Sequence, residues 1–467
     1  MNQTTYDYDI LCIGSGPAGQ RAAVQAAKLG KRAAVVEKRR IVGGICVDTG
    51  TIPSKTFRQA VVSLPDYTKG FQPSSSFDQD IQVSAAQVLG RIEHVLNTEA
   101  KVVEQQLRRN EVRLFRGEAR FHDPHTVIVT SESGMRRVTA ENILIAVGSV
   151  PTPPPGAKED GQTLTTSDGL LQLKRLPRSL VVIGGGIIGI EYASIFSALG
   201  VEVTLVDKRD RPLEFLDHEI VDDLIHQMRK RDVTFRLGEA VEHIEISENP
   251  ARRAVIHLES GKRLVSDLAL FSIGRIGATK ELNLETLGIE SDARGRLSVD
   301  AQYRTKIPHI FAAGDVIGYP SLAATSADQG RLVACHAFGV PAEPMAEHFP
   351  IGIYAIPEIS MVGRPEHILT AEKIPYEVGL ARYREIARGQ ILGDDTGFFK
   401  MLFHREDRRL LGVHVIGTNA TELVHIGQAV LGLGGGLDYF LNTVFNYPTL
   451  AECYKVAALD AANKLAL

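Results

Sequence analysis

The sequence predicts an α/β fold, because a unit of apolar strand, glycine-rich turn, helix and second strand occurs twice along its 467 residues. The two copies superpose when the chain is shifted by 170 residues, which also places Leu29-Gly30 on Leu199-Gly200. From about residue 346 to the end, predicted strands and helices alternate without a third glycine motif. A chain of this length provides for about three domains of roughly 150 residues each.

The first copy starts with the apolar run 10–13 and closes with the run 33–36, which Glu37 follows. Glycines at Gly-x-Gly-x-x-Gly spacing let the backbone turn tightly and approach a pyrophosphate at a helix N-terminus. An acid about 20 residues later accepts a hydrogen bond from an adenosine ribose. The unit therefore predicts a Rossmann-like dinucleotide site, with its glycines at Gly14, Gly16 and Gly19.

The second copy has the same order of elements. The apolar run 180–183 precedes the turn, and the run 203–206 ends at Asp207, which lies 23 residues after the first glycine of the motif. A glycine motif alone is weak evidence, but here it has a strand before it, a helix after it and an acid at the expected distance. A second dinucleotide site is predicted, with its glycines at Gly184, Gly186 and Gly189.

The residues after Asp207 bear on which nucleotide binds there. An acid at this position suits the ribose of NAD and would repel the 2'-phosphate of NADP. Three cations follow at once and are able to pair with that phosphate: Lys208, Arg209 and Arg211. The mixture favours a site that accepts both NAD and NADP; the alternative is a solvated charged turn after a strand.

Composition excludes several classes of protein. Apolar content is 44%, charged content is 23% and the net charge is -4 without a basic tail, so nothing indicates nucleic acid or an anionic membrane as a partner. The N-terminus lacks the pattern of a signal peptide, and no apolar run reaches the length of a membrane span. Four widely spaced cysteines form no disulfide framework, which predicts a cytoplasmic protein, and the histidines show no metal-binding spacing.

The elements between the motifs follow from periodicity and from glycine and proline. The run 151–155 is rich in proline and predicts a stiff linker. A polar loop is predicted over 65–80, helices over 54–60 and 85–109, and strands over 112–115, 126–129, 142–149 and 310–315.

The stretch 43–55 has the frame of a redox-active Cys-x4-Cys site with one sulfur missing. Cys46 is present, but Thr51 stands where the second cysteine belongs. A dithiol relay makes and breaks a bond between two sulfurs, so this stretch cannot perform one. Cys46 is then a small packed residue kept without redox duty, or alternatively a reactive thiol.

These landmarks together resemble the flavoprotein disulfide reductase family over nearly the whole chain. The resemblance implies FAD on the first unit, one per subunit, and a nicotinamide nucleotide on a second unit inserted into the first. It also implies a C-terminal α+β dimerisation domain and a homodimer, and leaves larger homo-oligomers open. The implied domains are 1–150 and 280–345 for FAD, 151–279 for NAD(P) and 346–467 for dimerisation.

The family pattern assigns individual residues in this chain. It implies that Glu37 holds the FAD ribose, that Ala119 lies near the adenine and that Asp315 bonds the ribityl chain. The remaining positions that it implies at the cofactors are Lys38, Gly43, Gly44, Cys46, Thr51, Gly148, Gly274 and Gly314.

The resemblance also pairs Lys55 with Glu191, and the pair has a mechanistic reason. Reduced flavin carries negative charge, which a fixed ammonium stabilises. A carboxylate partner keeps that ammonium charged and in position. The alternative is that Lys55 and Glu191 are unrelated surface charges.

Like the 43–55 stretch, the C-terminus lacks a group that the disulfide reductases use for thiol chemistry. The family carries a histidine, a proline and a glutamate as acid–base machinery for its thiols, and here Tyr447 replaces the histidine while Glu452 is kept. Tyrosine, with a pKa near 10, is a poor base at pH 7. Tyr447 then either caps the flavin site of the partner subunit or fills space.

The Cys-x4-Thr and Asn-Tyr-Pro-Thr patterns resemble the soluble pyridine nucleotide transhydrogenases. That subfamily implies an FAD-dependent enzyme that moves hydride reversibly from NADPH to NAD⁺ through one nicotinamide pocket, by ping-pong kinetics. Three alternatives remain: an NAD(P)H-dependent reductase of quinones or other small acceptors, a disulfide reductase that uses Cys46 with another thiol, and a nucleotide-binding sensor.

Overall fold

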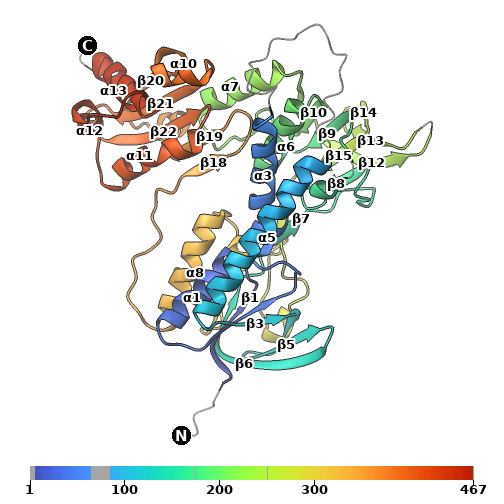
Figure 1. Cartoon of the computed structure of the whole chain (residues 1–467). Helices are drawn as coiled ribbons and strands as arrows, with labels where there is room; N and C mark the ends of the chain where they lie inside the picture. The colour runs from blue at the N-terminus through green and yellow to red at the C-terminus, as the bar shows by residue number, and fades with distance from the viewer. Residues whose placement is uncertain (1–5, 65–84, 174, 250, 466–467) are drawn as a thin grey trace.

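The computed structural model describes residues 6–64, 85–173, 175–249 and 251–465. The stretch 65–80, predicted as a loop, falls outside these residues. Three large sheets and the helices around them confirm the predicted α/β class (Figure 1). Within the described residues, no helix combines the length and the apolar character needed to cross a membrane.

The first sheet contains the first glycine motif and has the order β3-β2-β1-β6-β5-β4, with β17 also paired to β6. Its N-terminal strands and β17 are parallel, whereas β5 pairs antiparallel with the beginning of β6 and β4 pairs antiparallel with β5. Its strands are β1 (Tyr8–Ile13), β2 (Ala33–Glu37), β3 (Arg113–Arg116), β4 (Glu118–Asp123), β5 (Thr126–Ser131), β6 (Gly134–Ile145) and β17 (Ile310–Ala312).

Two helices cover one face of this sheet, α1 (Pro17–Lys28) and α8 (Ala323–Ala337). They approach closely because Gly330 faces the backbone of Ala18: a Cβ at that position would lie 2.0 Å from the Ala18 carbonyl oxygen. The strand predicted over 142–149 ends earlier, at Ile145. The chain turns through Gly148, whose φ is +69°, a value that glycine adopts without strain.

The second sheet is parallel throughout and has the order β11-β10-β9-β15-β8. Its central strands are nearly continuous runs of β-branched and leucine residues, as expected of strands covered on both faces. The strands are β8 (Leu164–Thr166), β9 (Ser179–Ile183), β10 (Glu202–Asp207), β11 (Thr234–Leu237) and β15 (Leu268–Phe271). The same unit contains helices α6 (Ile187–Ala198) and α7 (His218–Arg229). It also contains an antiparallel sheet of β12 (Val241–Ser247), β13 (Arg253–Leu258) and β14 (Arg263–Ser266).

The chain enters and leaves the second sheet through one ribbon. Strand β7 (Ser149–Pro151) pairs antiparallel with β16 (Arg275–Gly277), so the outgoing and returning segments are hydrogen-bonded to each other. The second unit therefore lies within the first in chain order, as predicted. The domain boundaries after residues 150, 279 and 345 remain predictions.

The C-terminal part is an antiparallel sheet of order β18-β19-β22-β21-β20 with helices around it. In the part of the chain that the structure describes, four short 3-10 helices connect larger elements: Leu170–Gln172, Leu284–Leu287, Asp315–Ile317 and, within the C-terminal part, Tyr383–Glu385. The strands of this sheet are β18 (Ile351–Ile353), β19 (Ile359–Gly363), β20 (Tyr376–Arg382), β21 (Phe398–His404) and β22 (Leu410–Ile416), and the helices are α9 (Glu366–Ala371), α10 (Ala387–Leu392), α11 (Ala420–Gly432), α12 (Leu437–Asn442) and α13 (Glu452–Leu465).

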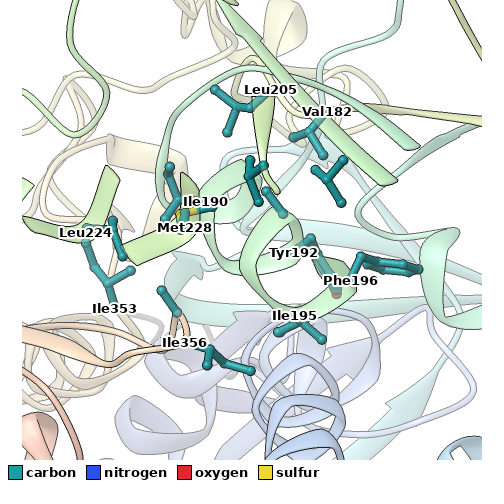
Figure 2. Close-up of a cluster of buried hydrophobic side chains, with 14 of the residues drawn as sticks. Val182, Ile190, Tyr192, Ile195, Phe196, Leu205, Leu224, Met228, Ile353 and Ile356 are labelled. Carbon is teal, nitrogen blue, oxygen red and sulfur yellow. The ribbon is translucent and has the colours of Figure 1, made fainter. Parts of the chain in front are cut away.

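Helices α2 (Gly44–Asp48), α3 (Thr51–Val62) and α5 (Ala85–Arg109) join the two nucleotide-binding units. In Figure 1, α3 lies beside α6. Helix α6 is apolar on nearly all sides and is buried, as such helices are. Its residues Ile190, Ile195 and Phe196 form one cluster with Ile353 and Ile356 from the C-terminal part (Figure 2). Each such side chain stabilises the junction by about 1.5–3 kcal/mol.

Gly189 and Gly186 give a matched test of the second glycine turn. A Cβ at Gly189 would lie 1.8 Å from the Gly184 carbonyl oxygen, whereas a Cβ at Gly186 would meet no atom within 4 Å. Because the contact is with rigid backbone, the overpacking cost lies at the upper end of the usual ~1–3 kcal/mol. The better helix propensity of alanine offsets about 1 kcal/mol of it. We expect Gly189→Ala to lower the free energy of unfolding by about 2 kcal/mol.

Gly186→Ala is the control: no atom obstructs its Cβ, and we expect a loss of only about 0.5–1 kcal/mol, because alanine is a poorer N-cap than glycine. Urea unfolding followed by far-ultraviolet circular dichroism measures both variants, since the chain has no tryptophan. Equal losses in the two variants would contradict the tight strand–helix contact at Gly189.

Candidate functional site

One cavity of about 2010 Å³ runs from the first glycine turn to the second and is bordered by the C-terminal part. Most residues predicted from the sequence line it. They are Gly14, Gly16, Glu37, Lys38, Gly44, Cys46, Thr51, Lys55, Ala119, Gly148, Gly184, Gly186, Glu191, Asp207, Lys208, Arg209, Gly274, Gly314 and Asp315.

Six predicted residues do not line this cavity, for different reasons. Gly19 and Gly189 face inward, where they let each helix pack on the first residue of its turn. Gly43 is a backbone position with φ of +116° whose N–H donates to Ser15. The other three are Arg211, Tyr447 and Glu452.

Both glycine turns offer a fitting cradle for a pyrophosphate. Gly16 and Gly186 are the N-caps of α1 and α6, and neither helix has a side chain that caps its free N–H groups. A Cβ at either glycine would extend into open space. Unpaired helix N–H groups that face a cavity favour an anion there. Gly44 adds to the first cradle, since a Cβ on it would lie 2.7 Å from the Gly16 Cα.

Glu37 is buried at the end of β2 and is held by the backbone around it. Its carboxylate accepts from the Ser15 N–H at 3.0 Å, the Ser15 hydroxyl at 2.5 Å and the Arg39 N–H at 2.7 Å. Ser15 in turn accepts from the Gly43 N–H at 2.9 Å. Ser15 thus joins the glycine turn to the acid and to the 43–55 stretch. Sequence reasoning missed it because it occupies a variable position of the motif.

Asp207 occupies the equivalent place in the second unit, and an arginine covers it. The Arg209 guanidinium donates from Nε at 2.9 Å and from Nη2 at 2.7 Å to the two carboxylate oxygens. The N–H groups of Gly185 and Arg209 also donate to Asp207. Burial by itself raises the pKa of the carboxyl, but the hydrogen bonds from Arg209 and Gly185 outweigh it and hold the Asp207 pKa below its usual value.

The other two cations of this turn differ in their placement. Lys208 is exposed and lines the cavity. Arg211 turns away from it: its guanidinium pairs with Asp222 on α7, and it does not contribute to the lining. The expectation that Arg211 lies at the nucleotide is therefore not met in this structure, because a helix carboxylate competes for its charge.

Cys46 and Thr51 lie at the starts of two successive helices. Cys46 is in α2, and Thr51, the first residue of α3, is within hydrogen-bonding reach of its thiol. Burial raises the pKa of the Cys46 thiol, and the Thr51 hydrogen bond and the Lys55 charge offset only part of that effect. The thiol therefore stays protonated near neutral pH, in agreement with a packed residue and not with an activated nucleophile.

The predicted contact between Lys55 and Glu191 is confirmed. Lys55 lies one turn after Thr51 in α3, and its Nζ is 2.8 and 2.7 Å from the two carboxylate oxygens of Glu191. Glu191 belongs to α6 and is only 3% exposed. The pair therefore joins the 43–55 stretch to the second glycine turn.

Two further residues that line the same cavity were missed. The Tyr354 N–H donates to Glu191 Oε1 at 2.8 Å, and the Tyr354 ring centroid lies 5.1 Å from Lys55 Nζ. Ser149 donates to Asp315 at 2.8 Å and accepts from Arg275 at 2.9 Å. Neither Tyr354 nor Ser149 lies in a recognisable motif, so only the fold reveals them.

Tyr447 and Glu452 belong to the C-terminal part, away from the cavity of their own chain. Tyr447 is 67% exposed, and Glu452 is the first residue of α13. The remaining cysteines are buried packing residues, as expected: Cys12 in β1, Cys335 in α8 and Cys453 in α13.

Family models and related sequences match nearly the whole chain. Residues 8–330 match the family model described as pyridine nucleotide-disulphide oxidoreductase, and residues 349–458 match the dimerisation domain of that family. A protein named soluble pyridine nucleotide transhydrogenase from Mycobacterium bovis is 50% identical over 461 residues, which is 98% of each chain. A protein of the same name from Photobacterium profundum is 43% identical over 469 residues, 99% of each chain.

Solved structures give the same result. LpdA from Mycobacterium tuberculosis superposes with a TM-score of 0.88 at 26% identity, covering 96% of this chain and 98% of its own. The HOCl-induced flavoprotein disulfide reductase RclA from Escherichia coli superposes with a TM-score of 0.86 at 27% identity, covering 97% and 99%. This chain belongs to the pyridine nucleotide-disulphide oxidoreductase family.

Proposed function

We propose that this protein is a soluble transhydrogenase that moves hydride reversibly between NADPH and NAD⁺. The observation that carries the proposal is the pairing of Cys46 with Thr51 beside Lys55 and Glu191: the site keeps its charged pair but has no second sulfur. The names of relatives at 43–50% identity over nearly the whole chain support it. Without a dithiol, hydride entering the site has no thiol exit, so it leaves to a second nicotinamide.

The first unit would bind one FAD per subunit. Gly14, Gly16 and Gly44 would accommodate the pyrophosphate, and Glu37 would accept from the ribose. Further positions in the same cavity are available to the rest of the cofactor: Lys38, Ala119, Gly148, Gly314 and Asp315. Gly43 would contribute from beside the cavity, through the backbone turn that its N–H fixes on Ser15. FAD would supply a group that accepts a hydride from one nicotinamide and returns it to another.

Lys55 and Glu191 would then stabilise the negative charge that develops on the bound cofactor. The Lys55 ammonium is fixed by a buried carboxylate and lies at the cavity surface, so it stabilises negative charge that develops there without first having to reorganise. Gly184, Gly186 and Gly274 would border the nucleotide that uses this pocket. One pocket used in turn by NADPH and NAD⁺ corresponds to ping-pong kinetics.

The Asp207–Arg209 pair would let one pocket accept both nucleotides. With NAD(H), the ribose hydroxyls meet Asp207, whose charge Arg209 already balances. With NADP(H), Arg209 would transfer its two hydrogen bonds from the carboxylate to the 2'-phosphate, a planar guanidinium being suited to either partner. Lys208, exposed at the same edge, would add a second positive charge.

The dimerisation domain supports a homodimer. Tyr447 and Glu452, which do not line the cavity of their own chain, would contribute to the site of the partner subunit.

An anaerobic titration tests the proposed function. One equivalent of NADPH should bleach the flavin absorbance of the purified yellow protein, because the site stores one electron pair. Thio-NAD⁺ added next should restore the absorbance and yield thio-NADH. Bleaching without reoxidation would instead indicate a reductase of quinones or other acceptors, and uptake of two equivalents by the native protein would reveal a second redox centre.

Thr51→Cys provides the matched control for electron counting. It restores the second sulfur beside Cys46, so after oxidation to the disulfide it should take up about two equivalents. If this variant and the native protein consume the same amount of NADPH, the titration does not report thiol redox state and the count carries no weight.

Arg209→Ala tests how the pocket accepts both nucleotides. A hydrogen bond to a charged group contributes about 1.5–3 kcal/mol, so we expect the KM for NADPH to rise on the order of tenfold or more, with a much smaller change for NADH. Steady-state kinetics with each nucleotide measures the ratio.

Arg211→Ala is the matched control. Because Arg211 pairs with Asp222 and lies outside the cavity lining, its loss should alter the NADPH-to-NADH ratio far less. Equal loss of both nucleotides in Arg209→Ala would contradict the exchange of partners.

A further inference from the structure

A short segment of the C-terminal part, residues 353–358, enters between the helices that carry Lys55 and Glu191. Ile353 and Ile356 are fully buried in the cluster built on α6 (Figure 2). Tyr354, between them in sequence, is only partly buried and lines the cavity. The two isoleucines therefore hold the backbone against the second unit, while the tyrosine side chain stays at the site.

Hydrogen bonds fix the segment to α6. The Tyr354 N–H donates to Glu191 Oε1 at 2.8 Å, and the Ile356 N–H donates to the Ser194 hydroxyl at 3.0 Å. Glu191 and Ser194 are one turn apart on α6, so two N–H groups of the segment follow one face of that helix. The contact with Glu191 uses an oxygen that also accepts from Lys55.

A buried ion pair fixes the same segment to α3. Arg58, one turn after Lys55, is 7% exposed and donates to the Ala355 carbonyl at 2.9 Å. Its guanidinium also pairs with Glu358 at 3.0 Å, and Glu358 accepts from the Thr421 hydroxyl at 2.9 Å. Lys55 and Arg58 share helix α3. The contacts of Arg58 with the 353–358 segment therefore fix Tyr354 relative to Lys55.

The Lys55 ammonium therefore has a carboxylate and an aromatic face as partners. Its Nζ is within 2.8 Å of both Glu191 oxygens and 5.1 Å from the Tyr354 ring centroid. The negative face of an aromatic ring attracts a cation within about 6 Å. We propose that Tyr354 is a positioning residue for Lys55, which keeps the ammonium at the cavity surface by its ring and orients Glu191 by its N–H.

The inference rests on the proposed function only in placing the bound flavin beside Lys55. Its test is the midpoint potential of that flavin, measured by dye equilibration without nicotinamide turnover. Tyr354→Leu removes the ring and keeps the N–H. A cation–π contact at a partly buried site changes an equilibrium on the order of fivefold. We therefore expect the potential to fall by about 20 mV, which is that fold-change at about 30 mV per tenfold for a two-electron couple.

Three variants separate this effect from a general loss of packing. Tyr354→Phe keeps the ring and should keep the native potential. Phe338→Leu makes the same kind of change at a remote cation–π contact, where Lys31 Nζ lies 5.0 Å from the ring, and should leave the potential unchanged. In a Lys55→Met background, Tyr354→Leu should cause no further shift, because the ring then has no cation to hold.

A native potential in Tyr354→Leu, or the same shift with and without Lys55, would overturn the proposal. If Tyr354→Leu unfolds or loses its flavin, phenylalanines with increasing fluorine content at position 354 replace it, since fluorine weakens the negative ring face and keeps the shape. The potential should then fall stepwise along the series, and a flat series would refute the role of the ring. If instead the native protein fails to reduce thio-NAD⁺, the proposed function fails while these potentials remain interpretable.

Discussion

The contact between Lys55 and Glu191 is the constraint on which the site depends. It joins α3, which begins beside Cys46, to α6, which begins at the second glycine turn. Glu191 is almost fully buried, and a buried carboxylate that loses its cation pays a large desolvation cost. The buried carboxylate of Glu191 is stabilised because both of its oxygens accept hydrogen bonds, from Lys55 and from the Tyr354 N–H. Helix α3, helix α6 and the 353–358 segment thus meet at the Glu191 carboxylate.

The same constraint explains why losing a sulfur leaves a working site. In a dithiol enzyme the pair of thiols takes electrons away from the site, whereas here Thr51 keeps the start of α3 without adding redox capacity. The change at Tyr447 is of the same kind, since an acid–base group for thiols has no task once the thiols are gone. The charged pair, which under the proposed function would stabilise the negative charge of a reduced cofactor, is unaffected by either change.

Much of the fold was predictable because its signals are local. The glycine turns, the acids at Glu37 and Asp207, and the helix Ala85–Arg109 follow from spacing and periodicity within a few tens of residues. The Lys55–Glu191 contact was predictable only through family resemblance. Tyr354 and Arg58 were not, because their roles arise from a segment about 300 residues further along the chain. The direction of Arg211 depends on competition with Asp222, which a one-dimensional pattern does not encode.

The ribbon of β7 and β16 determines how the second unit is attached to the first sheet. Its two strands carry the polypeptide out to the second sheet and back, and they are hydrogen-bonded to one another where they leave the first. To the host sheet, the whole inserted unit is equivalent to a hairpin loop, and loops tolerate long insertions at small entropic cost. The inserted unit therefore leaves the strand order of the host sheet intact, and β17 returns to pair with β6 after it. The Lys55–Glu191 ion pair then joins the inserted unit to its host a second time, so the two copies are fixed to each other at the site as well as at the ribbon.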